Sequence, residues 1–361
     1  MNIQKKESTS LPSAFHAFTV VIGLFVLIAA GMVYLPHALQ VVLFFAVLWV
    51  SIHARLIGYD VAAIRNMMNQ SLSKALPAFY IFLLIGMVIA ALMKSGTIAS
   101  LIYYGLSWLS PGLFLPVGFV LCALMSLATG TSWGTVGTLG LVFVGMAEAM
   151  GVPVYWVAGM VVSGATFGDK MSPISDTTNL AAMSAGVDLY QHISSMLYTT
   201  VPTFIIVFVV YLVVGLGFDS GSVTAESVVH MKTVLQSSFY LSPWVTFLPI
   251  VTLFVLSFMR FSPEVSMISA VFVAMFVAVC WQPVTFQEFS QALWKNSPAD
   301  IGHDALNQLL GRGGLYTMAW TLILAVLAMA LGGVLQGAGF LKSLLQGFIS
   351  QIKKAAHLVA V

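Results

Sequence analysis

Two aspartates, Asp169 and Asp176, lie in a polar stretch at 168–179 that interrupts long apolar segments, and Lys170 follows the first of them. Charged side chains at membrane depth are rare and usually mark the path of an ion or substrate. Pro173 removes a backbone donor and disfavours a helical conformation in the residue before it. We therefore expect the helix to unwind here and to expose carbonyl oxygens to a cation.

Hydroxyl and amide side chains around the two aspartates offer the oxygen ligands that a hard cation such as sodium prefers, by analogy with calcium and magnesium sites. A second polar interruption lies at 129–135, where glycines and hydroxyl residues cluster between two apolar arms. The two interruptions are close in sequence, and we expect them to face each other inside the membrane. The candidate ligands or positioning residues are Thr131, Ser132, Thr135, Ser175, Thr178 and Asn179.

The spacing of the two aspartates limits how they bind an ion. On one regular helix Asp169 and Asp176 would lie ~10 Å apart, too far to share one ion. Either the break at Pro173 shortens this distance or only one acid is a ligand, and Asp176 is the favoured one. Lys170 is the candidate charge partner; it pairs with an acid when sodium is absent, or it only offsets the local charge.

Each polar interruption also has a plainer interpretation. The stretch at 168–179 has the composition of an extramembrane loop, with Asp176 or Thr177 capping the helix that follows. The small residues at 129–135 are typical of a helix-packing surface in membranes.

The composition places the whole chain in a bilayer. Of 361 residues 60% are hydrophobic and 7% are charged, whereas about 25% are charged in a soluble domain. No basic patch indicates nucleic acid, and Cys122 and Cys280 lack the spacing of a disulfide framework or a metal site. No zinc-protease or nucleotide-binding motif occurs, and Asp60 lies in a basic connector where an intramembrane aspartyl protease would not carry an acid. We expect no enzyme activity and no cofactor.

Apolar segments of about 20 residues, the length that crosses a bilayer, recur along the chain. The expected spans are Ala14–Tyr34, Leu39–Ile57, Leu76–Met93, 152–191 with a break, Leu197–Leu216, Leu241–Ser257, Val265–Cys280 and Leu315–Leu335. Polar connectors are expected at Gly58–Ala75, Gly217–Ser238 and Gln282–Gly314, and an interfacial amphipathic helix at Thr97–Leu109.

An internal similarity suggests two repeats. Residues 92–101 resemble residues 335–344 at a constant offset of 243 residues, and the order of spans and connectors around them also repeats. Transporters are commonly built from inverted repeats. We expect an all-α polytopic protein with a first inverted repeat at 1–216, a connector at 217–240 and an incomplete second repeat at 241–361. The first repeat would hold a re-entrant hairpin at about 111–151 and a broken helix at about 152–191; two full spans are the alternative for the hairpin.

The lysines and arginines indicate the orientation. With a cytoplasmic N-terminus and the hairpin, most of them face the cytoplasm, as the positive-inside rule requires. We expect a multi-pass protein of the bacterial inner membrane with its N-terminus in the cytoplasm.

Four stretches match a family. They are Ala-Thr-Gly-Thr-Ser-Trp-Gly-Thr at 128–135, the polar stretch within 164–181, Leu-Tyr-Thr-Thr-Val-Pro at 197–202 and Arg-Gly-Gly at 312–314. They resemble the NhaC-type sodium/proton antiporters of the ion-transporter superfamily. The resemblance covers essentially the whole chain and is most specific at 168–179.

The resemblance implies secondary exchange of sodium ions for protons, and some similar proteins instead exchange carboxylates such as malate and lactate together with sodium and protons. Burial disfavours a charged carboxylate and a bound cation favours it, so Asp169 and Asp176 are expected to bind either sodium or protons, not both together. The expected partners are sodium ions, protons and the lipid bilayer; a homo-oligomer stays open. Family members continue beyond the position of Val361, and we expect a truncated chain.

Overall fold

The computed structural model describes residues 11–35, 38–173, 175–218, 225–259, 261–297, 301, 306–307 and 310–349. Within these ranges the regular elements are helices and no strand occurs. Among the described residues, five helices are long and apolar enough to cross a membrane, or up to seven if each bent pair is one span. The expected all-α polytopic membrane fold is confirmed.

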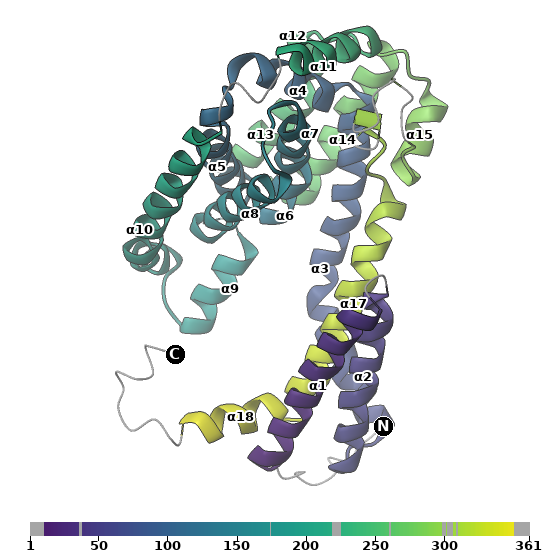
Figure 1. Cartoon of the computed structure of the whole chain (residues 1–361). Coiled ribbons are helices and arrows are strands. Elements are labelled where there is room, and N and C mark those ends of the chain that lie inside the picture. Colours follow the sequence, from purple (N-terminus) through teal and green to yellow (C-terminus); the bar gives the residue numbers. More distant parts are fainter. Residues whose placement is uncertain are drawn as a thin grey trace. The chain divides into compact units, whose positions relative to one another are not determined.

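One compact unit comprises residues 1–80 and 319–361. It contains α1 (Ala14–Tyr34), α2 (Leu39–Leu56), the first part of α3 (Val61–Lys94), most of α17 (Leu315–Gly337) and α18 (Phe340–Ile349) (Figure 1). The core of this unit consists of small and branched apolar side chains, among them Ala17, Val20, Ala46, Val50 and Val334.

The second compact unit comprises residues 81–318 and holds both polar interruptions. Its elements are α4 (Thr97–Trp108), α5 (Pro111–Thr129), α6 (Ser132–Thr135), the π-helix η1 (Val136–Gly140), α7 (Leu141–Ala149), α8 (Val154–Met171), α9 (Asp176–Ala185), α10 (Leu189–Leu216), α11 (Ala225–Ser238), α12 (Pro243–Thr246), α13 (Leu248–Phe258), α14 (Pro263–Cys280) and α15 (Phe286–Trp294). Its core gathers side chains from α3, α4, α5, α7, α8 and α14.

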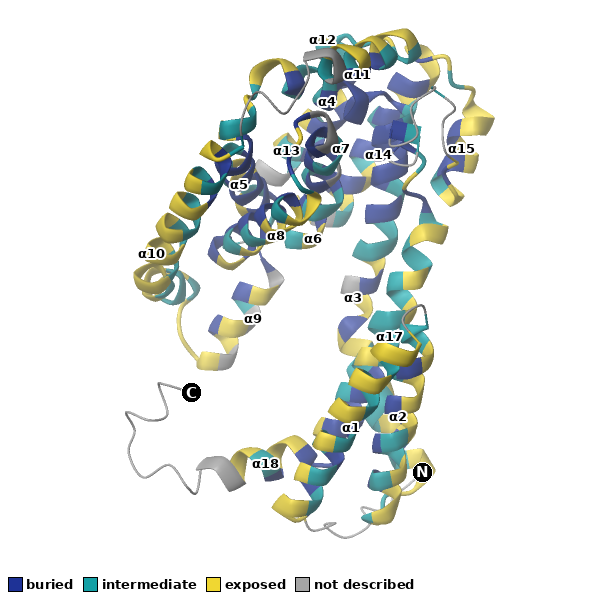
Figure 2. Ribbon diagram, in the orientation of Figure 1, coloured by how far each residue is buried: buried dark blue, intermediate teal, exposed yellow. Residues whose placement is uncertain are grey.

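The surfaces of the long helices are apolar. Figure 2 shows exposed faces along α1 and α10, and these faces carry Phe15, Phe25, Ile206 and Val213, each more than half exposed. A soluble protein rarely exposes a continuous apolar face of this kind. In a bilayer the same side chains contact lipid, which fits the composition of the chain.

The expected spans at Ala14–Tyr34, Leu39–Ile57 and Val265–Cys280 agree with α1, α2 and α14 to within two residues. Each of the three expected polar connectors contains a helix: the start of α3, α11 and α15 respectively. Local caps explain two of them. Asp60 Oδ1 accepts a hydrogen bond from the Ala63 N–H near the start of α3, and Thr285 and Glu288 form a capping box at α15.

Glycines with positive φ mark equivalent turns at the offset of 243 residues. Gly96 (φ +74°) separates α3 from α4, and Gly339 (φ +80°) separates α17 from α18. Four residues after each glycine comes a buried serine, Ser100 or Ser343, whose Oγ has no hydrogen-bond partner. This local equivalence agrees with the expected repeat, whose boundaries at 1–216 and 241–361 stay a prediction.

Candidate ion-binding site

The first polar interruption is a turn between two antiparallel helical arms. α5 ends at Thr129, and Gly130 takes the left-handed conformation (φ +68°) that a side chain would disfavour. Thr131 then caps α6, its Oγ1 accepting a hydrogen bond from the Gly134 N–H at 3.4 Å. The chain continues through η1 into α7, and the contact between the rings of Phe114 and Phe143 joins the two arms.

The second polar interruption is a break in a helix, as Pro173 predicts. α8 ends at Met171 and α9 begins at Asp176. Ser172 and Ser175 have extended backbone conformations (ψ 125° and 130°), so the described residues between the two helices are unwound. The predicted helix break is confirmed.

Close packing of α5 and α8 brings the two interruptions together. A Cβ on Gly164 would lie 2.5 Å from the carbonyl oxygen of Phe119, and a Cβ on Gly168 would clash with the carbonyl oxygen of Ala123. The contacts advance in the same direction along both helices, so α5 and α8 are parallel and end side by side. Ser172, which directly follows α8, links the ends of the two helices: its Oγ donates a hydrogen bond to the Leu127 carbonyl at 2.8 Å.

Asp169 lies where the two interruptions meet. Its residue surface is 9% exposed. Ser132 Oγ, from the first interruption, donates to Asp169 Oδ2 at 3.3 Å, and Ser175 Oγ, from the second, donates to Oδ1 at 2.7 Å. Within the described part of the chain these two hydroxyls are the hydrogen-bond partners of the carboxylate. The site is therefore a buried acid that is solvated by neutral oxygens.

Thr178 and Asn179 support the break without bonding to the carboxylate. Thr178 Oγ1 donates to the carbonyl oxygens of Asp169 (3.2 Å) and Lys170 (3.0 Å). Asn179 Nδ2 donates to the carbonyl oxygens of Pro173 and Ser175, both at 2.9 Å. These bonds satisfy carbonyls that the end of a helix leaves without a partner, so both residues position the site.

Thr131 and Thr135 belong to the hairpin tip itself. Thr135 is fully buried, and its Oγ1 donates to the Thr131 carbonyl at 3.2 Å. Neither side chain is hydrogen-bonded to Asp169, although Thr131 directly precedes Ser132.

Lys170 and Asp176 differ in how far the structure describes them. Lys170 is exposed and lines a cavity between α8 and α10 together with Thr200 and Phe204. The side chain of Asp176 lies outside the described residues, and the structure gives only its backbone position as the first residue of α9. The preference for Asp176 over Asp169 as the direct ligand stays a prediction.

The sequence reasoning missed two supporting hydroxyls, Ser126 and Ser172. Ser126 Oγ donates to the Ala165 carbonyl at 2.6 Å, and both serines are fully buried. Ser172 lies inside the polar stretch and could have been included on that ground, whereas Ser126 sits in an apolar helix and gives no signal. No group of three or more His, Cys, Asp or Glu side chains that could hold a resident metal occurs among the described residues.

Comparison with known proteins shows the family of the chain. The model of the Na+/H+ antiporter family matches residues 10–178 and 164–361, which covers both interruptions. The chain belongs to the Na+/H+ antiporter family. This membership confirms the resemblance to NhaC-type antiporters and identifies the chain as a transporter. No solved structure matches the chain.

Relatives of this chain are antiporters of different substrates. The chain is 31% identical to the malate-2H+/Na+-lactate antiporter of Bacillus subtilis over 96% of this chain and 74% of that protein. It is 35% identical to the Na+/H+ antiporter NhaC of Alkalihalophilus pseudofirmus over 82% of this chain and 64% of that protein. It is also 32% identical to the arginine/ornithine antiporter ArcD of Halobacterium salinarum over 91% of this chain and 68% of that protein.

Proposed function

We propose that this antiporter exchanges sodium ions for protons and that Asp169 is the group for which the two cations compete. One observation carries the proposal: Asp169 is buried, and its hydrogen-bond partners in the described structure are the neutral hydroxyls of Ser132 and Ser175. A buried carboxylate without a cationic partner is costly while it is charged. It is stabilised when it takes up a proton or binds a metal cation.

The length of α10 supports a site deep in the bilayer. Its 28 residues extend over roughly 42 Å, more than the ~30 Å of the hydrocarbon core. Thr200 Oγ1 donates to Met171 Sδ at 3.2 Å, which aligns Thr200 with the end of α8. Thr200 lies roughly 17 Å from the first residue of α10, so a centred helix would put the break near the membrane midplane, where transporters bind their ions.

Exchange then follows because sodium and a proton cannot occupy Asp169 at the same time. With sodium bound, the ion contacts the Asp169 carboxylate and is further coordinated by hydroxyl oxygens such as those of Ser132 and Ser175. With a proton bound, the carboxyl is neutral and no longer attracts sodium. Because each cation displaces the other, a gradient of one drives movement of the other without ATP.

The decisive experiment measures sodium-driven proton movement in everted membrane vesicles with a pH-sensitive dye. The chain is expected to exchange sodium for protons, and Asp169→Asn is expected to abolish the exchange because the amide cannot hold a proton or a net charge. Asp176→Asn, tested in parallel, decides whether the second aspartate shares this role.

Asp188→Asn is the matched control. Asp188 is exposed, and its Oδ1 caps α10 by accepting from the N–H groups of Tyr190 and Gln191. Asparagine caps helices about as well as aspartate, so this variant should exchange sodium normally. Normal exchange by Asp169→Asn would refute the proposed role of Asp169.

A second candidate function is exchange of small carboxylates coupled to sodium and protons. The observation that favours it is a cavity of about 400 Å³ between α5, α8 and α10, a size within the usual range of small-molecule sites. Lys170 contributes a positive charge to the wall of the cavity, on the residue next to Asp169. The remaining lining consists of hydroxyl and apolar side chains, Ser163, Thr166, Thr199, Thr200, Thr203, Phe119, Phe167, Phe204 and Val207.

Uptake of radiolabelled malate and lactate by the same vesicles tests this candidate. Carboxylate exchange predicts uptake that Lys170→Gln removes and Lys170→Arg retains, because the charge attracts the carboxylate. Lys342→Gln, which changes an exposed lysine on α18, serves as the control. Uptake of neither acid by the unmodified chain would exclude the candidate.

A further inference from the structure

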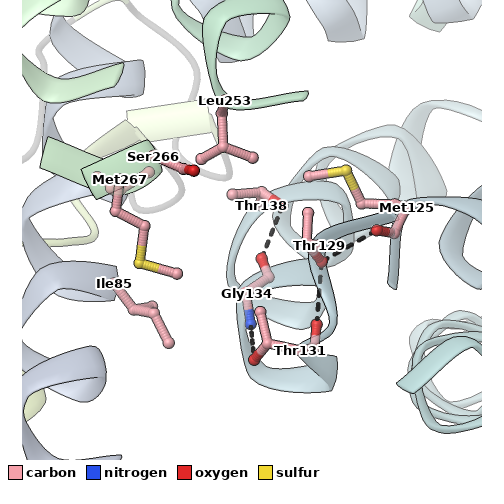
Figure 3. A pocket seen from close by; sticks show the side chains of 10 residues that line it. Ile85, Met125, Thr129, Thr131, Gly134, Thr138, Leu253, Ser266 and Met267 are labelled. Atoms are coloured by element: carbon pink, nitrogen blue, oxygen red, sulfur yellow. Dashed lines mark hydrogen bonds between the residues drawn. The ribbon is translucent and has the colours of Figure 1, made fainter. Parts of the chain in front are cut away.

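A small cavity lies beside the hairpin tip and is distinct from the contacts of Asp169. It has a volume of about 20 Å³, room for about one water molecule. Figure 3 shows its lining side chains, which come from α3, α5, the hairpin tip, η1, α13 and α14. They are Ile85, Val88, Met125, Thr129, Thr131, Gly134, Thr138, Leu253, Ser266 and Met267.

Three hydroxyl groups in this wall, those of Thr129, Thr138 and Ser266, donate their protons to backbone carbonyls. Thr129 Oγ1 donates to the Met125 carbonyl at 3.0 Å, and Thr138 Oγ1 donates to the Gly134 carbonyl at 2.7 Å (Figure 3). Ser266 Oγ donates to the carbonyl of Ser262, one turn earlier in α14, at 3.2 Å. A hydroxyl has one proton and two lone pairs, so these oxygens can offer only lone pairs to a ligand.

The chemistry of the wall selects the ligand. A set of oxygen acceptors without a lysine or arginine does not favour an anion, whereas a hard monovalent cation prefers oxygen ligands of this kind. The rest of the lining is mostly apolar and includes Ile85, Val88 and Leu253, and a volume of about 20 Å³ leaves no space for a hydration shell. The cavity therefore suits one dehydrated cation of about the size of a water molecule.

The position of the cavity connects it to the carboxylate. Thr131 lines the cavity, and the next residue, Ser132, donates to Asp169. The tip continues into the π-helix η1, and Thr138 of η1 contributes its hydroxyl to the wall. π-helical turns are rare and occur often at functional sites. Ser266 adds an oxygen from α14, far along the chain from the first hairpin.

We propose that this cavity is a second subsite for the transported sodium ion, in which the hydroxyl oxygens of Thr129, Thr138 and Ser266 replace part of the hydration shell of the ion. The proposal rests on the proposed sodium/proton exchange and adds a carboxylate-free subsite to it. Thr138 and Ser266 then determine the affinity for sodium, although neither touches Asp169 in the described hydrogen bonds.

The test is equilibrium binding of 22Na+ to the purified full chain. Thr138→Val keeps the shape of the side chain and removes the oxygen, Thr138→Ser restores the oxygen, and Ser266→Ala removes the oxygen from the opposite element. Loss of the oxygen in Thr138→Val or in Ser266→Ala should raise the apparent Kd for sodium about fivefold, the effect of one polar contact. The Kd of Thr138→Ser should stay close to that of the unmodified chain.

Thr252→Val is the matched control, because Thr252 Oγ1 also donates one turn back, to the Leu248 carbonyl at 2.8 Å, but does not line the cavity. Unchanged sodium affinity in both Thr138→Val and Ser266→Ala would mean that the cavity holds only water and would overturn the proposal. If one variant fails to fold, the other decides. Absence of any sodium binding by the unmodified chain, or unchanged binding by Asp169→Asn, would instead count against the proposed function.

Discussion

Ser132 Oγ donates a hydrogen bond of 3.3 Å to Oδ2 of Asp169, although the two residues belong to different polar interruptions. Ser175 completes the pair on the other carboxylate oxygen at 2.7 Å. The acid, near the end of α8, thus accepts one hydroxyl hydrogen bond from each polar interruption. Hydroxyls in this position can solvate the carboxylate and can turn an oxygen toward a bound cation.

The two serines should contribute unequally to sodium binding. Ser175→Ala removes the shorter bond to a carboxylate, a type of contact worth about 1.5–3 kcal/mol, and is expected to raise the sodium KM at least about tenfold. Ser132→Ala removes the longer bond and should have a smaller effect. Sodium titrations in everted vesicles measure both, with Ser107→Ala, an exposed serine of α4, as control. Equal KM values in all three variants would contradict the assignment.

Asn179 should stabilise the helix break. Asn179→Ala loses both hydrogen bonds from Nδ2, to the carbonyls of Pro173 and Ser175, and leaves those carbonyls less well satisfied. The expected cost is about 1–3 kcal/mol, visible as a lower midpoint of thermal unfolding in detergent. An unchanged midpoint would show that solvent or lipid replaces these bonds without cost.

Gly168 should tolerate no side chain. A Cβ at this position clashes with the carbonyl oxygen of Ala123 across the α5–α8 contact, and overpacking of this kind costs about 1–3 kcal/mol or more. Gly168→Ala is expected to lower both thermal stability and exchange activity. Gly332→Ala in α17 is the matched control, since a Cβ there meets nothing within 4 Å. Equal stability of the two variants would contradict the close packing.

Glu288 should titrate below the ordinary range of a glutamate. The backbone N–H of Thr285 lowers the pKa of the Glu288 carboxyl by hydrogen bonding, and the Thr285 hydroxyl adds to this effect. A lowered pKa means that the capping box stabilises α15 above the unfolded-state pKa, ~4.3. This stabilisation is lost as the pH falls through the lower folded-state value.

An NMR titration of the labelled Glu288 carboxyl in detergent checks this prediction. The midpoint is expected to rise in Thr285→Val, which keeps the backbone donor and removes the hydroxyl. A midpoint that does not move would mean that the hydroxyl bond is not populated in solution.

The orientation of the chain can be read by cysteine labelling. From the positive-inside bias we propose a cytoplasmic N-terminus, which puts position 188 on the cytoplasmic side and position 295 on the outside. Both cysteine variants are made in a Cys280→Ser background. Asp188→Cys should react with a membrane-impermeant maleimide in everted vesicles, and Lys295→Cys should react with the same reagent in intact cells. The buried Cys122 should stay unlabelled in both. The reverse pattern would invert the proposed orientation.

The membrane fold, the main helices and the two polar interruptions could be predicted from the amino-acid sequence. Apolar segments of spanning length must be helical in a bilayer, because every backbone polar group needs an internal partner there. Pro173 and Gly130 end helices for local steric reasons, so their effects are readable without the tertiary structure. Two helices in the polar connectors also have a local sequence signal, the capping residue Asp60 and the capping pair Thr285 and Glu288. These helices were not predicted because the segments are too polar to be recognised as spans.

Which polar groups meet could not be predicted from the sequence, because it depends on how the helices pack. Ser132 and Ser175 look like Thr135 and Thr178 in the sequence, since all four are hydroxyl residues in polar stretches. The parallel packing of α5 on α8, which requires Gly164 and Gly168, brings Ser132 to Asp169, and the break after α8 brings Ser175 there. Thr135 and Thr178 instead donate to backbone carbonyls. Ser266 joins the small cavity from a distant helix, and no local pattern contains such a long-range contact. Spacing along the chain sets where a helix ends, whereas side-chain partners depend on how the helices pack.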